Sequence, residues 1–303
     1  MKLFDAHCHL PTPEVLEHAA AAGVAGMAVC ADFSKHWENR EDVLLALDAG
    51  VIGGFSFFRT LENLDLKFPN IGTKKKIPMQ LVPNIGIHPW SVSRDWKEKF
   101  QCVKACCGGA RSFFQTLEKP DLDFSMPGKE AAMLWLGVGE TGLDFSSFAE
   151  ASEDRQEIDK VEQEECFAAH LDLARALNHP VTVHCVQAWG RLVKILRGHP
   201  APKVMFHAYS GSAELVFELI NLNCRFSFGD AVMNPEAKRV RAAVVVVPDD
   251  RLLIETDSDS EPEKLIEVAR AVAELRGVSV EEIAELTFNN AQTLFDRRTN
   301  REV

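Results

Sequence analysis

Short apolar runs rich in β-branched residues alternate along this chain with longer segments whose apolar positions recur at helical spacing. The short runs predict strands at residues 3–5, 26–30, 79–87, 134–139, 181–184, 203–207, 224–228 and 252–256. The longer segments predict helices at residues 13–22, 40–49, 95–107, 153–178, 188–197, 213–221, 235–246, 262–276 and 280–295. Strands that alternate with helices form parallel sheets, and eight such units favour a closed barrel over an open sheet.

We therefore expect an α/β protein with a TIM-type (β/α)8 barrel. No internal repeat, low-complexity stretch or linker interrupts the alternation, so residues 1–303 are expected to form a single domain. Two irregular segments, Ile52–Lys76 and Gly108–Lys129, are long enough to be insertions. Each follows a predicted helix and precedes a strand, which places it at the N-terminal end of the barrel, away from the end that carries active sites. The basic run Lys74–Lys76 is interpreted as a solvated loop.

The composition excludes some classes of protein. With 46% hydrophobic residues, 18 glycines and 14 prolines, the chain is globular rather than disordered or collagen-like. Its net charge is -12, whereas proteins that coat duplex nucleic acid through many phosphate contacts need a surplus of Lys and Arg. An anionic substrate must therefore be held locally, and its binding should depend only weakly on salt.

The sequence also bears on cellular compartment. The longest uncharged run, His18–Ala31, is shorter than the roughly 20 apolar residues that span a bilayer. Asp5 interrupts the N-terminal segment before any apolar stretch develops, so the chain does not begin like a secretory signal. The eight cysteines form no CxxC pair, which favours reduced thiols over disulfides. We expect a cytoplasmic or nuclear protein that is neither secreted nor bound to a membrane.

Half of the ten histidines fall at or just beyond the C-terminal ends of predicted strands, namely His7, His9, His88, His184 and His207. His7 and His9 are spaced i, i+2, so on an extended strand both side chains point to one face. Two carboxylates, Glu140 and Asp257, also end predicted strands. The remaining histidines are interpreted as surface or capping residues: His18, His36, His170, His179 and His199.

Each residue also has a structural interpretation. Taken singly, His184 and His207 are more typical of satisfied core histidines, and Glu140 and Asp257 of helix N-caps. Burying so many polar groups at one barrel mouth without a cation would be costly, however. The joint pattern therefore favours a site for divalent metal.

The chain resembles the TatD-type metal-dependent deoxyribonucleases along essentially its whole length. The motifs that carry the resemblance occur in the family's order: Phe4-Asp5-Ala6-His7-Cys8-His9-Leu10, Gly86-Ile87-His88-Pro89, Gly139-Glu140-Thr141-Gly142-Leu143-Asp144, Pro180-Val181-Thr182-Val183-His184, Phe206-His207-Ala208-Tyr209-Ser210-Gly211 and Ile254-Glu255-Thr256-Asp257. The resemblance implies an amidohydrolase-like TIM barrel with two divalent metals that hydrolyses phosphodiesters.

By motif, the resemblance implies that His7, His9 and Asp257 hold one metal, that His184 and His207 hold the other, and that Glu140 bridges them. The metal is Mg, Mn or Zn, and mixed imidazole and carboxylate ligands do not decide among these. Paired metals roughly 3.5 to 4 Å apart clamp the attacking and leaving oxygens and lower the pKa of a bound water. Asp257 is the expected general base for that water, so Asp257 and Glu140 are the catalytic candidates.

The substrate contacts are expected to differ from the family's pattern. Val186 stands where the family usually has Arg, and Arg191 is the nearest replacement. Asp259 replaces a Pro after the Thr-Asp pair, and Pro11 replaces a polar residue after the first motif. His88 and Ser210 complete the candidate substrate contacts with Arg191.

The expected substrate is nucleic acid, most simply single-stranded or frayed DNA ends. Trp90 and Trp189 each follow a strand that ends in a candidate residue, and both are candidates for stacking on bases. One alternative is an amidohydrolase acting on an amide, ester or lactone, although such enzymes often bridge their metals with a carbamylated Lys. The other alternative is a binding protein without catalysis on the same barrel. The sequence leaves the oligomeric state open.

Overall fold

The computed structural model describes residues 1–9, 11, 13–32, 64–67, 74–77, 79–108, 137–146 and 160–295. Within these residues, eight strands pair in parallel in chain order. They are β1 (Leu3–Cys8), β2 (Val24–Asp32), β5 (Gln80–Gly86), β6 (Gly137–Asp144), β7 (Pro180–Val186), β8 (Lys203–Phe206), β9 (Cys224–Phe228) and β10 (Leu252–Ile254). The edge strands β1 and β10 also contact each other. The sheet is therefore a TIM-type (β/α)8 barrel, which confirms the predicted fold.

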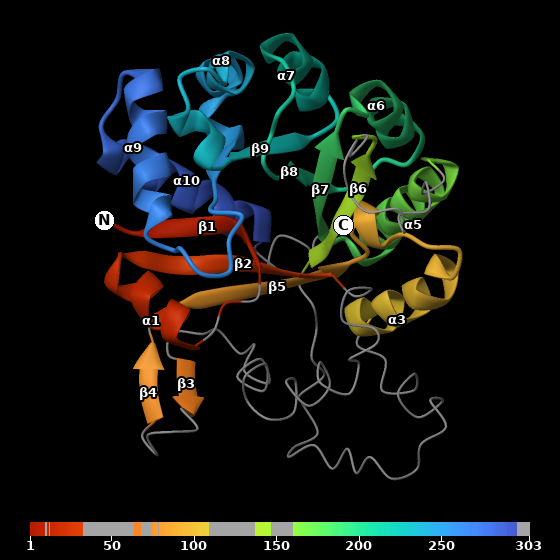
Figure 1. The fold of residues 1–303 in the computed structure, drawn as a ribbon, viewed down its shortest axis with the longest axis horizontal. Coiled ribbons are helices and arrows are strands. Elements are labelled where there is room, and N and C mark those ends of the chain that lie inside the picture. Colours follow the sequence, from red (N-terminus) through yellow and green to blue (C-terminus); the bar gives the residue numbers. More distant parts are fainter. Residues whose placement is uncertain are drawn as a thin grey trace, which may run out of the picture.

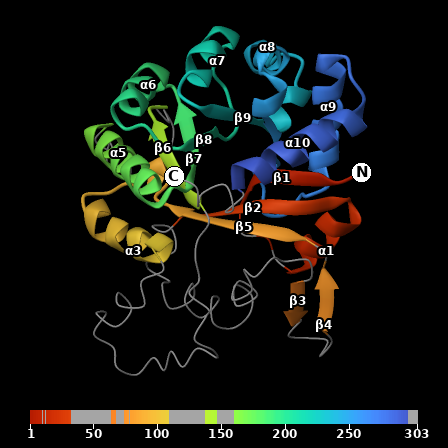
Figure 2. The ribbon, with the colours of Figure 1, turned by 180° about the vertical axis from the view of Figure 1, so that it is seen from behind.

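Helices follow the strands around the outside of this barrel (Figure 1), and the view from behind shows the same succession (Figure 2). They are α1 (Pro13–Ala21), α3 (Trp96–Gly108), α5 (Lys160–Leu177), α6 (Trp189–Gly198), α7 (Ala213–Ile220), α8 (Lys238–Val246), α9 (Lys264–Arg276) and α10 (Val280–Phe295). Among the described residues, three 3-10 turns lie between them: η2 (Pro89–Ser91), η3 (Asp230–Met233) and η4 (Asp249–Arg251). Each observed helix overlaps a predicted one, while the predicted helix at 40–49 lies outside the described residues.

Strand β6 extends further than its prediction, which ended at Gly139. The glycines at 139 and 142 permit close pairing with β7. Gly139 has φ 129° and Gly142 has φ 148°. A Cβ on Gly142 would collide with the backbone of His184, so the strand can lie this close to its neighbour only with glycine there.

The segment predicted as irregular, Ile52–Lys76, contains part of a hairpin, so that prediction is wrong for its described residues. Strands β3 (Leu64–Lys67) and β4 (Lys74–Ile77) pair antiparallel, with Leu64 opposite Ile77. The interpretation of Lys74–Lys76 as a loop is therefore wrong as well, because three consecutive lysines conceal the alternation of the strand. The second predicted insertion, Gly108–Lys129, lies outside the described residues beyond Gly108, the last residue of α3.

The barrel strands are buried on two sides. Most of their buried residues pack in one large core with the surrounding helices. Helix α6 shows the pattern that produces such a layer. Its Leu192, Val193 and Leu196 are buried, whereas Lys194 and Arg197 are exposed. A second cluster, which we call the apolar floor, consists of Phe4, Ala6, Ala28, Val82, Met205, Leu253, Ala291, Leu294 and Phe295. Because strands from different sides of the barrel contribute to it, the floor lies inside the barrel.

Helix α10 closes the N-terminal end of the barrel beneath the floor. Gln292 hydrogen-bonds Gln80 at the start of β5, and the Asn290 amide donates to the carbonyl of Leu252 at the start of β10. The Phe295 ring stacks on Phe4, with ring centroids 5.8 Å apart. Both views show α10 beside β1 (Figure 1, Figure 2). The opposite end of the barrel is left for polar side chains.

Two further expectations bear on the described residues. The cysteines at 8, 30, 166, 185 and 224 are buried free thiols, as expected for reduced cysteines. Within the described ranges, no helix combines the length and the apolar character that a membrane crossing requires.

Candidate metal centre

The ends of β1 and β10 bring two histidines and a carboxylate together. The backbone N–H of Asp257 donates to the carbonyl of His7 at 3.1 Å, which joins the two edges of the barrel. The Nε2 atoms of His7 and His9 then lie 3.3 and 3.2 Å from Oδ1 of Asp257. His7 is fully buried, whereas the His9 side chain is 47% exposed. The predicted convergence of this i, i+2 pair is therefore present.

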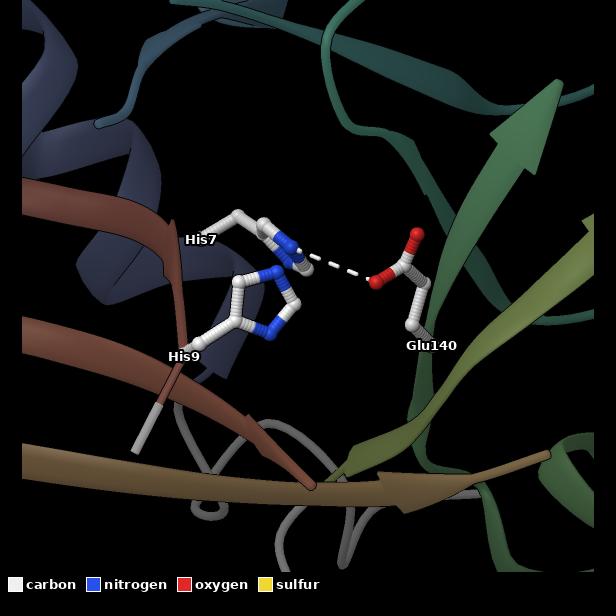
Figure 3. Close-up of side chains that lie close together, drawn as sticks. All are labelled: His7, His9 and Glu140. Carbon is white, nitrogen blue, oxygen red and sulfur yellow. Dashed lines mark ion pairs between the residues drawn. The ribbon is translucent and has the colours of Figure 1, made fainter. Parts of the chain in front are cut away.

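Glu140 lies at the centre of the histidines, with its side chain 5% exposed. Its Oε2 faces Nε2 of His7 at 3.4 Å, and Figure 3 shows this contact with His9 beside it. Its Oε1 faces Nε2 of His207 at 2.7 Å and Nδ1 of His184 at 3.0 Å. The two oxygens of one carboxylate thus face two separate sets of imidazole nitrogens.

The electrostatics of the centre follow from burial and from these contacts. Burial by itself raises the pKa of Glu140, but the charge of His207 and hydrogen bonds from the imidazoles outweigh it, so the pKa lies well below its usual range. Burial lowers the pKa of His207, yet Glu140 raises it to about 10. The site therefore holds ionised carboxylate and strongly favours positive charge around it.

A carboxylate outside the cluster orients His184, and a second one lies near His207. Nε2 of His184 lies 3.1 Å from Oδ2 of Asp144, which leaves Nδ1 facing Glu140. Nδ1 of His207 lies 3.6 Å from Oε1 of Glu255, which is too far for a hydrogen bond, while its Nε2 faces Glu140. A carboxylate partner such as Asp144 fixes the tautomer and the ring orientation of a metal-binding histidine. The inward-facing Nδ1 of His184 is thereby available as a ligand.

His88 has the opposite arrangement. Its Nδ1 accepts the backbone N–H of Trp90 at 3.1 Å, so in the neutral ring the proton resides on Nε2. That Nε2 lies 3.2 Å from Oε1 of Glu140. His88 therefore faces the same carboxylate as His184 and His207, but it does so as a hydrogen-bond donor.

Asp5 supports the β1–β10 junction from below. Its carboxylate accepts the backbone N–H of Thr256 at 3.0 Å, the Thr256 hydroxyl at 2.7 Å and the backbone N–H of His7 at 3.3 Å. Burial raises the pKa of Asp5 to about 7 against the opposing effect of the Thr256 bonds. A single buried side chain thus fixes the backbone on both sides of the His7–Asp257 contact.

The side chains fit a divalent cation. Three groups have ligand atoms that all lie within 4.8 Å of one another: His7, His9 and Glu140; His7, His207 and Asp257; and His88, Glu140 and His184. The buried Nε2 of His7 makes no hydrogen bond within the described part of the chain, although two carboxylates lie beside it. A nitrogen surrounded by anionic oxygens but not aligned to them suits a cation between them.

The remaining candidates lie elsewhere. Ser210 is partly buried in the segment after β8, at the same end of the barrel. Arg191 on α6 makes a two-pronged ion pair with Glu164 on α5, at 2.6 and 2.7 Å, so its guanidinium is engaged on the helical layer rather than with the histidines. Trp189 packs against Phe206 and Tyr209 in the outer core.

One histidine was misjudged from the sequence. His170 was interpreted as a surface or capping residue, but it is fully buried. Its Nε2 accepts the backbone N–H of Ile87 at 3.2 Å, and its Nδ1 donates to the carbonyl of Cys166 at 2.8 Å. It holds the end of β5 against α5, immediately before His88, and burial lowers its pKa to about 4.

Sequence reasoning assigned no role to three buried carboxylates, Asp5, Asp144 and Glu255. Asp144 stands four residues after Glu140 on one strand, a spacing that returns to the same face. That spacing was a usable signal for a residue near the site. Asp5 and Glu255 each precede a candidate ligand by two residues, the same i, i+2 spacing that His7 and His9 have, so this spacing was a usable signal for them as well.

The chain is also similar to known proteins in sequence. The sequence model of the family described as TatD related DNase matches residues 4–296. A human protein named deoxyribonuclease TATDN3 is 26% identical, over 97% of this chain and 95% of its own length. The uncharacterized metal-dependent hydrolase YcfH of Escherichia coli is 34% identical over 53% of this chain. The match spans only 62% of YcfH's own length.

Solved structures agree at the level of the fold. The TatD homologue YjjV of Escherichia coli has a TM-score of 0.66 at 23% identity, with 97% of each chain covered. A 5-methylcytosine deaminase of Klebsiella pneumoniae has a TM-score of 0.55 at 10% identity, covering 97% of this chain and 74% of its own. By its family match across nearly its whole length, the chain belongs to the TatD-related DNase family.

Proposed function

We propose that this protein is a metal-dependent phosphodiesterase that cleaves nucleic acid, most simply single-stranded or frayed DNA ends, with two divalent cations. In this proposal His7, His9 and Asp257 hold one cation, His184 and His207 hold the other, and Glu140 bridges them. The observation that carries it is the position of Glu140, whose Oε2 faces His7 while its Oε1 faces His184 and His207.

Bound divalent cations supply two things in such a site, a water with a lowered pKa and positive charge against the phosphate oxygens. That charge is what the chain itself lacks, since its net charge is -12. Two dications outweigh the two negative charges of Glu140 and Asp257. Local cations thus reconcile an acidic protein with an anionic substrate.

Asp257 is better placed than Glu140 to take a proton from the attacking water. Its side chain is 40% exposed, while that of Glu140 is 5% exposed. Burial raises the pKa of Asp257, but the imidazoles of His7 and His9 beside it outweigh burial and hold that pKa below its usual range, so the carboxylate is ionised. Glu140, enclosed by imidazoles, is suited to holding cations.

His88 supplies a donor at the same place. Because Trp90 occupies its Nδ1, the proton on Nε2 points toward Oε1 of Glu140, at the centre of the histidine cluster. We assign His88 to a phosphate oxygen rather than to a cation. Ser210, at the same end of the barrel, stays a candidate contact, whereas Arg191 would first have to release Glu164.

The name of the human relative, a deoxyribonuclease aligned over 97% of this chain, supports DNA as the substrate. An amidohydrolase acting on an amide, ester or lactone is the rival enzyme. Its bridging Lys has no counterpart here, because Glu140 holds that position and Lys203 lies at the start of β8, bonded to the carbonyls of Thr293 and Leu294. A binding protein without catalysis is the third possibility, and retention of the full ligand set argues against it.

Hydrolysis of end-labelled DNA tests the proposal. Purified protein is incubated with single-stranded and double-stranded oligonucleotides in Mg²⁺, Mn²⁺ or Zn²⁺, and with small esters and lactones. We expect cleavage of DNA that chelation abolishes, and loss of cleavage in Asp257→Asn with the fold retained by circular dichroism. Asp172→Asn on the surface of α5 is the matched control and should cleave normally. Preferential turnover of esters, or full activity of Asp257→Asn, would overturn the proposal.

A further inference from the structure

Trp90 lies at the rim of the histidine cluster with an unusual combination of exposure and anchoring. It belongs to η2, directly after His88, and 49% of the residue is exposed. Its indole N–H donates to Oδ2 of Asp144 at 2.7 Å. A large aromatic ring is thus held in one orientation by a buried carboxylate while much of its surface faces outward.

Both N–H groups of Trp90 are directed at candidate site residues. The backbone N–H donates to Nδ1 of His88, and the indole N–H shares its acceptor, Oδ2 of Asp144, with Nε2 of His184. The other oxygen of Asp144 is held by the backbone N–H and hydroxyl of Ser146. Asp144 is therefore fixed from several sides, and the indole shares its rigidity.

The ring lies close to the imidazoles. Its centroid is 4.9 Å from that of His88 and 6.2 Å from that of His184, with interplanar angles of 75° and 66°. Any flat group that stacks on the exposed indole surface would be within one nucleotide of a phosphate bound at His88. An anchored ring loses little conformational freedom when it binds, so stacking on it is efficient.

We propose that Trp90 is the stacking platform for the nucleobase next to the phosphodiester that is cleaved. This inference rests on the proposed nuclease function and adds a substrate-recognition residue to it. It requires an unstacked base, so it selects single strands and frayed ends over intact duplex. Because Trp90 also donates its backbone N–H to His88, the proposed contacts to base and phosphate lie on one bonded unit.

Binding and cleavage of oligonucleotides with and without single abasic residues test this role. Binding is followed by fluorescence anisotropy with phosphorothioate-linked strands that resist hydrolysis, and cleavage with ordinary strands. Because stacking on an aromatic residue strengthens binding of a base, wild-type protein should bind the normal strand roughly tenfold more tightly than the strand lacking the critical base. Trp90→Leu should lose this preference, while Trp90→Phe, which keeps a ring, should retain part of it.

Trp189→Phe is the matched control, because Trp189 packs in the outer core, and it should leave the preference unchanged. The role of Trp90 alone would be overturned if Trp90→Leu still cleaved DNA and still preferred the normal strand over the abasic strand as strongly as wild type does. If the wild-type protein neither binds nor cleaves any strand, the nuclease function itself fails and this inference falls with it.

Discussion

The two ends of the barrel are built from the same strands but by different means. At the N-terminal end, Phe4 and Leu253 bury apolar surface in the floor beneath which α10 lies. At the C-terminal end, a few residues further along β1 and β10, His7 and Asp257 bring polar atoms into the same barrel. The floor needs nothing beyond the chain to be stable, since apolar burial is favourable by itself.

The mouth, in contrast, collects groups whose burial is unfavourable unless they are paired. His7, Glu140 and His207 are buried, and a further set of buried carboxylates holds them in place. This difference indicates that the floor specifies the fold and that the mouth is kept for chemistry. Changes at the two ends should therefore separate stability from activity.

The largest effect should come from the floor. Phe4→Ala removes a buried ring that stacks on Phe295 and lies edge-on to Phe288, so it should lower the free energy of unfolding by about 3–5 kcal/mol. Activity per folded molecule should change little. Urea unfolding measures the first quantity and cleavage at low temperature the second. Phe4→Leu, which keeps most of the volume, is the control and should lose much less stability.

His9→Ala changes the mouth at the end of the same strand. Loss of a supporting residue around a metal typically costs about 10- to 100-fold, so removal of a proposed ligand should reduce cleavage on the order of a hundredfold. Stability should change by less than about 1 kcal/mol, because the His9 side chain is 47% exposed. Metal content by atomic absorption and unfolding by urea check both. A strongly destabilised but active variant would contradict the separation of the two ends.

His170 is a buried histidine outside the cluster, so it should affect stability without taking part in the site. The effect expected from it is smaller than the two above. Its folded-state pKa of about 4 lies below the 6.5 of an exposed histidine. Between these values the unfolded chain binds a proton that the folded protein does not, so stability falls as the pH drops through this window. From pH 7 to pH 5 the loss due to His170 is about 2 kcal/mol.

His170→Gln removes this titration and keeps a polar side chain. Its free energy of unfolding, measured by urea at several pH values, should therefore decline less steeply below pH 6.5 than that of wild type. All other groups titrate in both proteins, so the difference isolates His170. Parallel declines would show that His170 is not neutral in the folded protein.

Much of this structure follows from the sequence because each strand is a short apolar run. All eight barrel strands were predicted, and five histidines and two carboxylates at strand ends were expected at one mouth. Five histidines do face Glu140 or Asp257 there. The spacing of apolar residues and the order of the strands suffice to predict this cluster, because the carboxyl ends of parallel barrel strands all lie at the same face.

What the sequence concealed depends on contacts between distant segments. The extension of β6 depends on glycines that permit close approach to β7, and a GxTG-like pattern suggests a turn when read alone. The role of His170 depends on its burial against Ile87, 83 residues away. The tautomer of His88 depends on a backbone N–H that no pattern of side chains reveals.

The bond from the Thr256 hydroxyl to Asp5 joins residues 251 apart. Closing so long a loop is entropically costly, and contacts of this range form late in folding. During synthesis, β1 and the two histidines at its end leave the ribosome long before β10 does. These histidines cannot contact Asp257 until β10 has been made. A cation that contacts His7 and Asp257 together, as proposed, would bind after closure and would oppose reopening by mass action. The proposed catalytic centre thus includes the seam at which the barrel closes.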